Sequence, residues 1–169
     1  MFRRTDEGYG LEPRWRELDA PLPELWTAYS REEIPGLFGL NVPRNFLNQG
    51  FVATPHHIFL FVTLNKEDLP EEYRYQDGFL GPEVFQWESQ RRTKQDSKTG
   101  RSIQNHRELE FAVQLFVRRD KKVAGRTQPF TYCGPVEFVR WEGEHPIRVE
   151  WKLAEPVPER LRERFSVDR

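Results

Sequence analysis

The chain has 169 residues, of which 37% are hydrophobic and 31% are charged, so one domain with a sizeable core is expected. Its formal net charge of −1 at pH 7 gives no global signal for nucleic acid, and no apolar run approaches the roughly 18 residues of a membrane span. The N-terminus lacks the apolar segment of a secretory signal, and the single cysteine, Cys133, excludes an internal disulfide, which favours a reducing, cytoplasmic location.

The first predicted elements are a polar tail and a short helix. Residues 1–24 are polar and rich in proline, which predicts a tail or a linker from a preceding domain and leaves 25–169 as a single domain. Ser30 and Glu33 have the spacing of a capping box, in which each side chain accepts a hydrogen bond from the backbone amide of the other residue. We therefore expect a short helix that ends by Gly39.

The chain then reads as strands. The segment 58–64 is apolar on both faces, which is typical of a central strand. The segments 109–117 and 147–153 alternate between apolar and polar residues, so each should direct one face at a core. In the first of these, Gln114 and Arg118 are expected on the solvent face.

Further strands complete this pattern. The segment 84–88 is a strand candidate, and 131–141 is another that is interrupted by a bend or bulge at Gly134-Pro135. A charged hairpin loop is expected at 120–125, and a helical turn at 159–165. Five or more strands with little helix predict a small, strongly bent sheet or barrel.

Positive charge is concentrated locally in residues 89–107. Cations interleaved with hydroxyl and amide side chains suit phosphate oxygens, because the charge supplies affinity and the neutral donors supply geometry. We predict contacts to a DNA backbone from Ser89, Gln90, Arg91, Arg92, Thr93, Lys98 and Arg101. The alternative is a solvated, mobile loop between two strands. A second basic cluster near the hairpin, which includes Arg118, is expected to have a supporting role only.

Aromatic and acidic residues beside the basic segment are candidates for a base-binding pocket. Phe85 and Trp87 alternate on a strand, and either ring could stack on a base. Tyr73 and Tyr75 each offer a π-face and a hydroxyl, and Asp77 could accept a hydrogen bond from an exocyclic amino group. The plain alternatives are core packing for the strand aromatics and a surface turn at Asp77.

Several of these segments also carry a family resemblance. They are LFVTLNK (60–66), YRYQD (73–77), FQWESQRRTKQDSKTGR (85–101) and GPVEFVRWEGEHPIRVEWKL (134–153). Over about residues 25–160 the chain resembles an uncharacterised domain at the C-terminal end of restriction proteins that also contain a phospholipase-D-like nuclease and a superfamily-2 helicase.

The resemblance implies a target-recognition module of modification-dependent (type IV) restriction. Such modules resemble SRA, EVE or YTH folds, which flip a modified base into an aromatic pocket. The expected fold class is therefore α+β and β-rich, as a compact PUA/SRA-like bent sheet or barrel with short peripheral helices. The chain has no helicase P-loop and no HxKxxxxD nuclease motif, so cleavage is expected in another domain or partner.

An enzymatic alternative comes from an E-x-K pattern at Glu150 and Lys152, which PD-(D/E)xK nucleases use to hold a metal and a water. This chemistry also needs an upstream acid, for which Glu137 or Glu142 would have to serve. The plainer interpretation is a polar row on the solvent face of a strand. No metal-ligand spacing appears among the histidines and the cysteine, so neither a metal nor another cofactor is expected.

Taken together, the residues and the resemblance predict a non-catalytic module that binds double-stranded DNA and reads a modified base, of the 5-methylcytosine type, by base flipping. Two alternatives remain at this stage. One is the metal-dependent nuclease that uses Glu150 and Lys152, and the other is a protein-interaction module that docks a helicase or nuclease partner.

Overall fold

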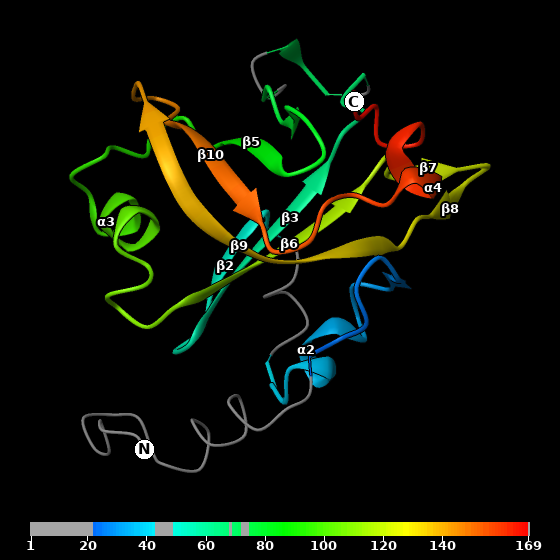
Figure 1. The fold of residues 1–169 in the computed structure, drawn as a ribbon, viewed down its shortest axis with the longest axis horizontal. Helices are drawn as coiled ribbons and strands as arrows, with labels where there is room; N and C mark the ends of the chain where they lie inside the picture. Colours follow the sequence, from blue (N-terminus) through cyan, green and yellow to red (C-terminus); the bar gives the residue numbers. More distant parts are fainter. Residues whose placement is uncertain (1–21, 43–48, 68, 72–74, 169) are drawn as a thin grey trace.

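The computed structural model describes residues 22–42, 49–67, 69–71 and 75–168 (Figure 1). In chain order the elements are β1 (Ala28–Tyr29), α2 (Ile34–Leu37), β2 (Phe51–Ala53), β3 (His57–Thr63), β4 (Gly78–Phe79), β5 (Val84–Glu88), α3 (Lys98–Gln104), β6 (Ala112–Arg118), β7 (Lys122–Val123), β8 (Arg126–Thr127), β9 (Phe130–Glu142), β10 (Arg148–Leu153) and α4 (Glu159–Arg162). Within the described ranges, no helix has the length and apolar character that crossing a membrane requires.

One mixed sheet forms the body of the domain. Its strands follow the order β2-β3-β6-β9-β10-β5-β4, and β1 pairs with β9 beside this path. The path does not close on itself, so the described strands form a bent open sheet and not a barrel. The predicted β-rich class, a bent sheet with short helices at its periphery, agrees with these elements.

The pair β3 and β6 is parallel, whereas its neighbours are antiparallel. A parallel pair needs a long crossover connection. Here the connection is the segment 64–111, which contains β4, β5 and α3. The basic segment and the predicted base pocket both belong to this crossover.

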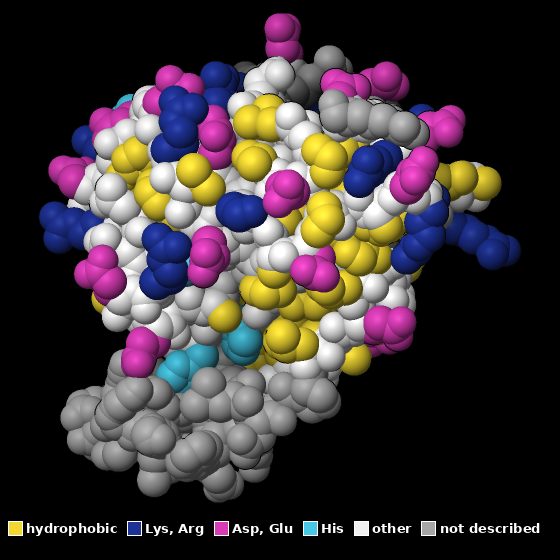
Figure 2. All heavy atoms as spheres, in the orientation of Figure 1, with side chains coloured by type: hydrophobic (Ala, Val, Ile, Leu, Met, Phe, Trp, Pro, Cys, Tyr) yellow, Lys and Arg dark blue, Asp and Glu magenta, His cyan; other side chains and the backbone are white. Residues whose placement is uncertain are grey.

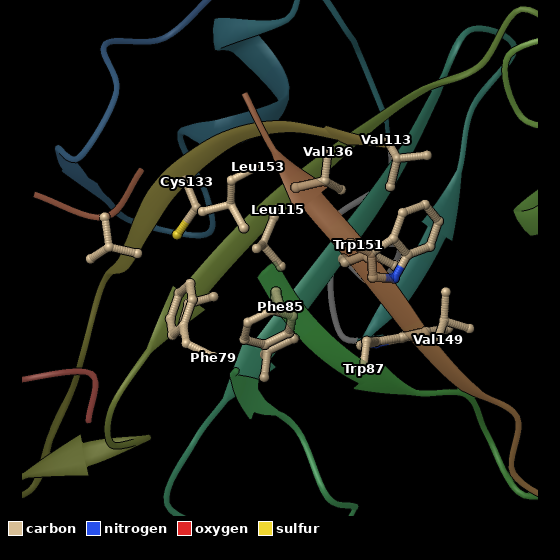
Figure 3. Close-up of a cluster of buried hydrophobic side chains, with 14 of the residues drawn as sticks. Phe79, Phe85, Trp87, Val113, Leu115, Cys133, Val136, Val149, Trp151 and Leu153 are labelled. Carbon is tan, nitrogen blue, oxygen red and sulfur yellow. The ribbon is translucent and has the colours of Figure 1, made fainter. Parts of the chain in front are cut away.

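The first hydrophobic cluster lies on the face of the sheet toward which β10 and β5 curl (Figures 1 and 3). Alternate residues of each strand supply it, among them Leu60, Leu115 and Trp151, all of which are fully buried. The predicted inward row over 147–153 is confirmed, since Val149 and Leu153 of β10 and Ile147 just before it are also buried in this cluster.

A second cluster covers the other face of β3 and β6. Phe59, Phe61 and Phe116 pack there against Phe38, which follows α2. Since β3 is buried on both faces, the prediction of a central strand at 58–64 is confirmed. The helix α2 is reached through the predicted capping box at Ser30 and Glu33, whose reciprocal hydrogen bonds are both present.

The prediction for the outer face of β6 was wrong. Gln114 is buried and accepts a hydrogen bond from the Tyr132 hydroxyl at 2.6 Å, and Arg118 is only 7% exposed. The strand also begins at Ala112 and not at Leu109, which is exposed. Alternation marks two faces, but it cannot show that a second layer covers the polar one.

Two predicted turns are confirmed. In β9 the register with β6 shifts where Cys133 forms an extra residue before Gly134, whose φ is +92°. This bulge bends the long strand. At the tip of the β7–β8 hairpin, Ala124 and Gly125 both have positive φ, which suits the right-handed twist of a two-residue turn.

Candidate nucleic-acid interface

A cleft of about 1390 Å³ lies where the carboxyl ends of β3, β5 and β6 meet the turn before α2 and the β7–β8 hairpin. Six residues predicted from the sequence line it, namely Tyr75, Asp77, Trp87, Gln90, Arg91 and Arg92. The structure thus brings residues 90–92 of the basic segment and three of the five predicted pocket residues to one concave surface. Tyr73 lies outside the described residues.

The aromatic wall of the cleft combines a half-buried tyrosine and a buried tryptophan. Trp87 is 5% exposed and packs against Phe51, with the ring centroids 6.0 Å apart. The guanidinium carbon of Arg91 lies 5.9 Å from the centroid of the Tyr75 ring. Tyr75 therefore presents an aromatic surface beside the Arg91 cation, which follows the end of β5.

Asp77 lies at the buried end of this wall. Its side chain is 7% exposed and pairs with Lys66, which is 12% exposed, while its other oxygen accepts the backbone amide of Glu88 at 2.8 Å. Glu88 in turn accepts the amide of Gln76 at 2.6 Å, so two carboxylates tie residues 76–77 to β5. Burial raises the pKa of Asp77, and the Lys66 ammonium opposes this rise.

The start of the basic segment is docked on the turn between β9 and β10. The backbone amide of Gln95 donates to a Glu144 carboxylate oxygen at 2.8 Å, and its side-chain amide donates to the Gly143 carbonyl at 3.0 Å. His145 Nδ1 lies 3.0 Å from the carbonyl oxygen of Arg91. These contacts join residues 91–95 to the turn between β9 and β10.

The later part of the basic segment is helical, which the sequence analysis did not predict. Ser97 caps α3 by accepting from the amide of Gly100 at 3.0 Å. A Cβ atom at Gly100 would lie 2.3 Å from the Lys94 carbonyl oxygen, so the turn packs directly on this glycine. Lys98 and Arg101 lie on α3, at the end of the sheet away from the β7–β8 hairpin (Figure 1), and neither lines the cleft.

Residues 24–165 match the model of a family described as "Domain of unknown function (DUF3427)". The chain belongs to this family. The match agrees with the resemblance to an uncharacterised domain that the sequence motifs indicate. No curated protein matches the chain.

Solved structures show what fold the DUF3427 domain has. The SUVH5 SRA domain in complex with fully methylated CG DNA matches with a TM-score of 0.51 and 13% identity, over 83% of this chain and 96% of that chain. The SUVH5 SRA domain with methylated CHH DNA matches with a TM-score of 0.52 and 11% identity, over 82% and 97%. A looser match, with a TM-score of 0.46 and 18% identity over 68% and 35%, is the MspJI restriction endonuclease with a 27-mer oligonucleotide; it is too distant to support an argument.

Two of the predicted site residues of the DUF3427 domain are structural. Phe85 is fully buried and packs edge-on against Phe79, with the centroids 4.8 Å apart, so it does not line the cleft. Ser89 is buried, and its hydroxyl accepts the amide of Ile147 at 2.9 Å, which leaves it unavailable to a phosphate. Thr93 also lies outside the cleft lining. The Ser89 hydroxyl therefore satisfies a backbone amide at the end of β5.

Lys66, Arg31 and Arg118 also line the cleft, although none of them was among the predicted site residues. Lys66 follows β3 directly and pairs with Asp77, although eleven positions separate them in the chain. Arg31 and Arg118 come from the turn before α2 and from the end of β6. Lys66 falls inside the LFVTLNK motif, which was the one sequence signal that could have marked it as a site residue. No sequence pattern connects Arg31 with Arg118.

The residues of the nuclease alternative lie outside the cleft and are engaged in ion pairs. Glu150 pairs with Arg140 at 2.7 Å, and Lys152 pairs with Glu83 at 3.2 Å. Among the residues that the structure describes, no group of three or more His, Cys, Asp or Glu side chains is placed to hold a metal ion.

Surface charge is mixed outside the cleft. On the face shown in Figure 2, basic and acidic side chains are interspersed, and hydrophobic side chains gather to the right of centre. This face therefore has no extended cationic surface for a DNA backbone. Basic side chains from distant parts of the chain line the cleft, among them Arg31, Arg91 and Arg118.

Proposed function

We propose that this domain binds double-stranded DNA and holds a modified base, of the 5-methylcytosine type, extruded into the cleft. The observation that carries the proposal is the meeting of an aromatic wall, a buried carboxylate and two arginines in one cleft of an SRA-like sheet. The SUVH5 SRA domains with the same fold were solved with methylated DNA, which supports modified DNA as the ligand class.

Each part of the cleft has a distinct role in this proposal. Arg91 and Arg92 bind phosphates, which supplies affinity that does not depend on the base. Tyr75 stacks on the extruded base, with the edge of Trp87 beside it, and stacking contributes roughly 1–3 kcal/mol per base. Asp77 has acceptor capacity beyond its bonds to Lys66 and Glu88, which suits an exocyclic amino group.

The domain supplies recognition in this proposal, and cleavage belongs to another domain or to a partner that carries a nuclease. The support is that Glu150 and Lys152 are each neutralised by a neighbour on the sheet and lie away from the cleft. No metal or cofactor is needed for the binding step. This assignment separates the proposal from the nuclease alternative.

The test compares one duplex without modification and with each candidate modification, at two salt concentrations. Tyr75→Ala should remove most of the discrimination while leaving weak, salt-sensitive binding, because stacking acts on the base and the cations act on every phosphate. Tyr75 is preferred to Trp87 for this test, because truncating buried Trp87 would also cost about 3–5 kcal/mol of stability.

Trp141→Ala is the matched control, since Trp141 is a half-buried aromatic residue that packs against Phe138 outside the cleft. It should leave the discrimination unchanged. Equal affinity of the wild-type protein for all duplexes would contradict the proposal, and so would full discrimination by Tyr75→Ala.

A further inference from the structure

Two arginines of the cleft lie against the same aromatic ring. The guanidinium carbons of Arg118 and Arg31 are 4.2 Å and 4.9 Å from the centroid of Phe130, and that of Arg31 is also 4.9 Å from the centroid of Phe61. Both rings belong to the second hydrophobic cluster. The two cations thus share a partly apolar setting on the face of the sheet opposite to Trp87.

Neither arginine has an acidic partner among the described residues. Arg118 donates to two neutral acceptors, the Thr63 hydroxyl at 2.8 Å and the Gln128 carbonyl at 3.0 Å. Arg31 is adjacent in sequence to Glu32, yet no ion pair joins them. Like-charged, partly desolvated cations without a counter-ion are an unfavourable arrangement unless an anion completes it.

The other carboxylates that line the cleft are already engaged. Asp77 pairs with Lys66, Glu88 with Arg148, and Asp120 with Arg119. None of them is available to neutralise the arginine pair without breaking an existing contact. The positive charge is therefore directed at the open space of the cleft.

The acid–base properties of the pair agree with this geometry. Burial, and after it the nearby charge of Arg31, together lower the pKa of Arg118 to about 10. Burial also lowers the pKa of Arg31, against the opposing charge of Glu32. Both shifts have the direction expected when a cation is partly removed from water, and a bound anion would oppose them.

We propose that Arg31 and Arg118 form a binding site for one phosphodiester group of the DNA backbone. This inference rests on the proposed function, and it adds a phosphate site on the far side of the cleft from the base. Planar guanidinium groups suit phosphate oxygens because they can donate in a bidentate manner. The Phe130 ring holds both groups in place, so the site needs little ordering when the DNA binds.

The first experiment measures duplex affinity against salt concentration for Arg31→Gln, Arg118→Gln and Arg119→Gln. Arg119 is the matched control, because it is adjacent to Arg118 but is 63% exposed in its side chain and lies outside the cleft lining. Arg31→Gln and Arg118→Gln should each weaken binding about tenfold and reduce the salt slope by about one unit, whereas Arg119→Gln should change both much less.

The second experiment replaces single phosphates of the duplex by neutral methylphosphonates, one position at a time. In the wild-type protein, one position should reduce affinity about as much as Arg31→Gln does. In Arg31→Gln, the same replacement should have no further effect, because the contact is already lost. Losses that simply add at every position would overturn the phosphate site.

The outcomes separate this inference from the proposed function. Wild-type protein that discriminates modified DNA, with affinity and salt slope unchanged in Arg31→Gln, would overturn the phosphate site alone. Wild-type protein that binds no duplex would overturn both. Arg31 is half-buried, so Arg31→Gln tests the site even if Arg118→Gln lowers the melting temperature, and Arg118→Lys, which keeps the charge, should restore part of the salt slope.

Discussion

At the scale of single residues, buried polar side chains hold distant segments together. His106 is 2% exposed and bridges two of them: its Nδ1 lies 3.1 Å from the Phe111 carbonyl oxygen, and its Nε2 accepts the amide of Phe138 at 3.1 Å. This pair of bonds requires the neutral ring with its proton on Nδ1. Burial lowers the pKa of His106, which also favours the neutral ring.

We predict that His106 makes the fold less stable in mild acid. Its pKa is lower in the folded state than the ordinary value of about 6.5, so the unfolded chain binds the proton first as the pH falls. The contribution is complete above about pH 6.5 and is lost as the pH falls toward the folded pKa. Denaturant unfolding at pH 7.5, 6.5 and 5.5 should show this loss in the wild type and less of it in His106→Gln. Parallel pH curves would contradict the prediction.

At the scale of elements, the turn between β9 and β10 acts as a platform for the basic segment. Glu144 and Gly143 both hold Gln95, and the amide of Ile147 is held by the Ser89 hydroxyl. The turn therefore positions Arg91 and Arg92, although its own charged side chain, Glu144, is negative and cannot attract a phosphate. Ordering of this kind lowers the entropic cost of binding a ligand.

We predict that Glu144→Ala weakens DNA binding although it removes a negative charge. Releasing Gln95 should cost about two- to tenfold in affinity, because the segment must then be ordered on binding. Glu142→Ala is the control, since it removes the same charge from an exposed position two residues away. Titration of one duplex with both variants measures the effect. Tighter binding in both variants would show that charge, and not ordering, governs this surface.

At the scale of the whole molecule, a chain with a net charge of −1 acquires a cationic cleft through its topology. Because β3 and β6 are parallel, a long crossover, residues 64–111, must connect them. This crossover carries Arg91 and Arg92, which line the same cleft as Arg118 at the end of β6. Lys98 and Arg101 of α3 do not line this cleft, and α3 lies at the end of the sheet away from the β7–β8 hairpin (Figure 1).

We predict that two sets of basic residues differ in their effect on DNA. The variant Arg91→Gln/Arg92→Gln should reduce the salt slope by about one unit per lost contact, whereas Lys98→Gln/Arg101→Gln, with the same loss of charge, should reduce it less. Affinity measured at several salt concentrations for both double variants is the test. Equal slopes would extend the interface to α3.

The sequence by itself determined part of the local structure, because periodicity and capping depend on neighbours in the chain. The two-sided burial of β3, the inward row of β10, the capping box at Ser30 and the bulge at Gly134 were all readable in this way. The motif resemblance also indicated the family and the SRA-like fold.

Only the tertiary structure decided which polar residues are structural and which face the cleft. Ser89 and Arg91 are two positions apart in one basic segment, yet one is buried against Ile147 and the other lines the cleft. Arg31 and Arg118 meet on Phe130 because β6, β9 and the segment around α2 contribute to one hydrophobic cluster on a face of the sheet. Such contacts join residues distant in the chain, and their partners follow from strand order and packing, which no local pattern encodes.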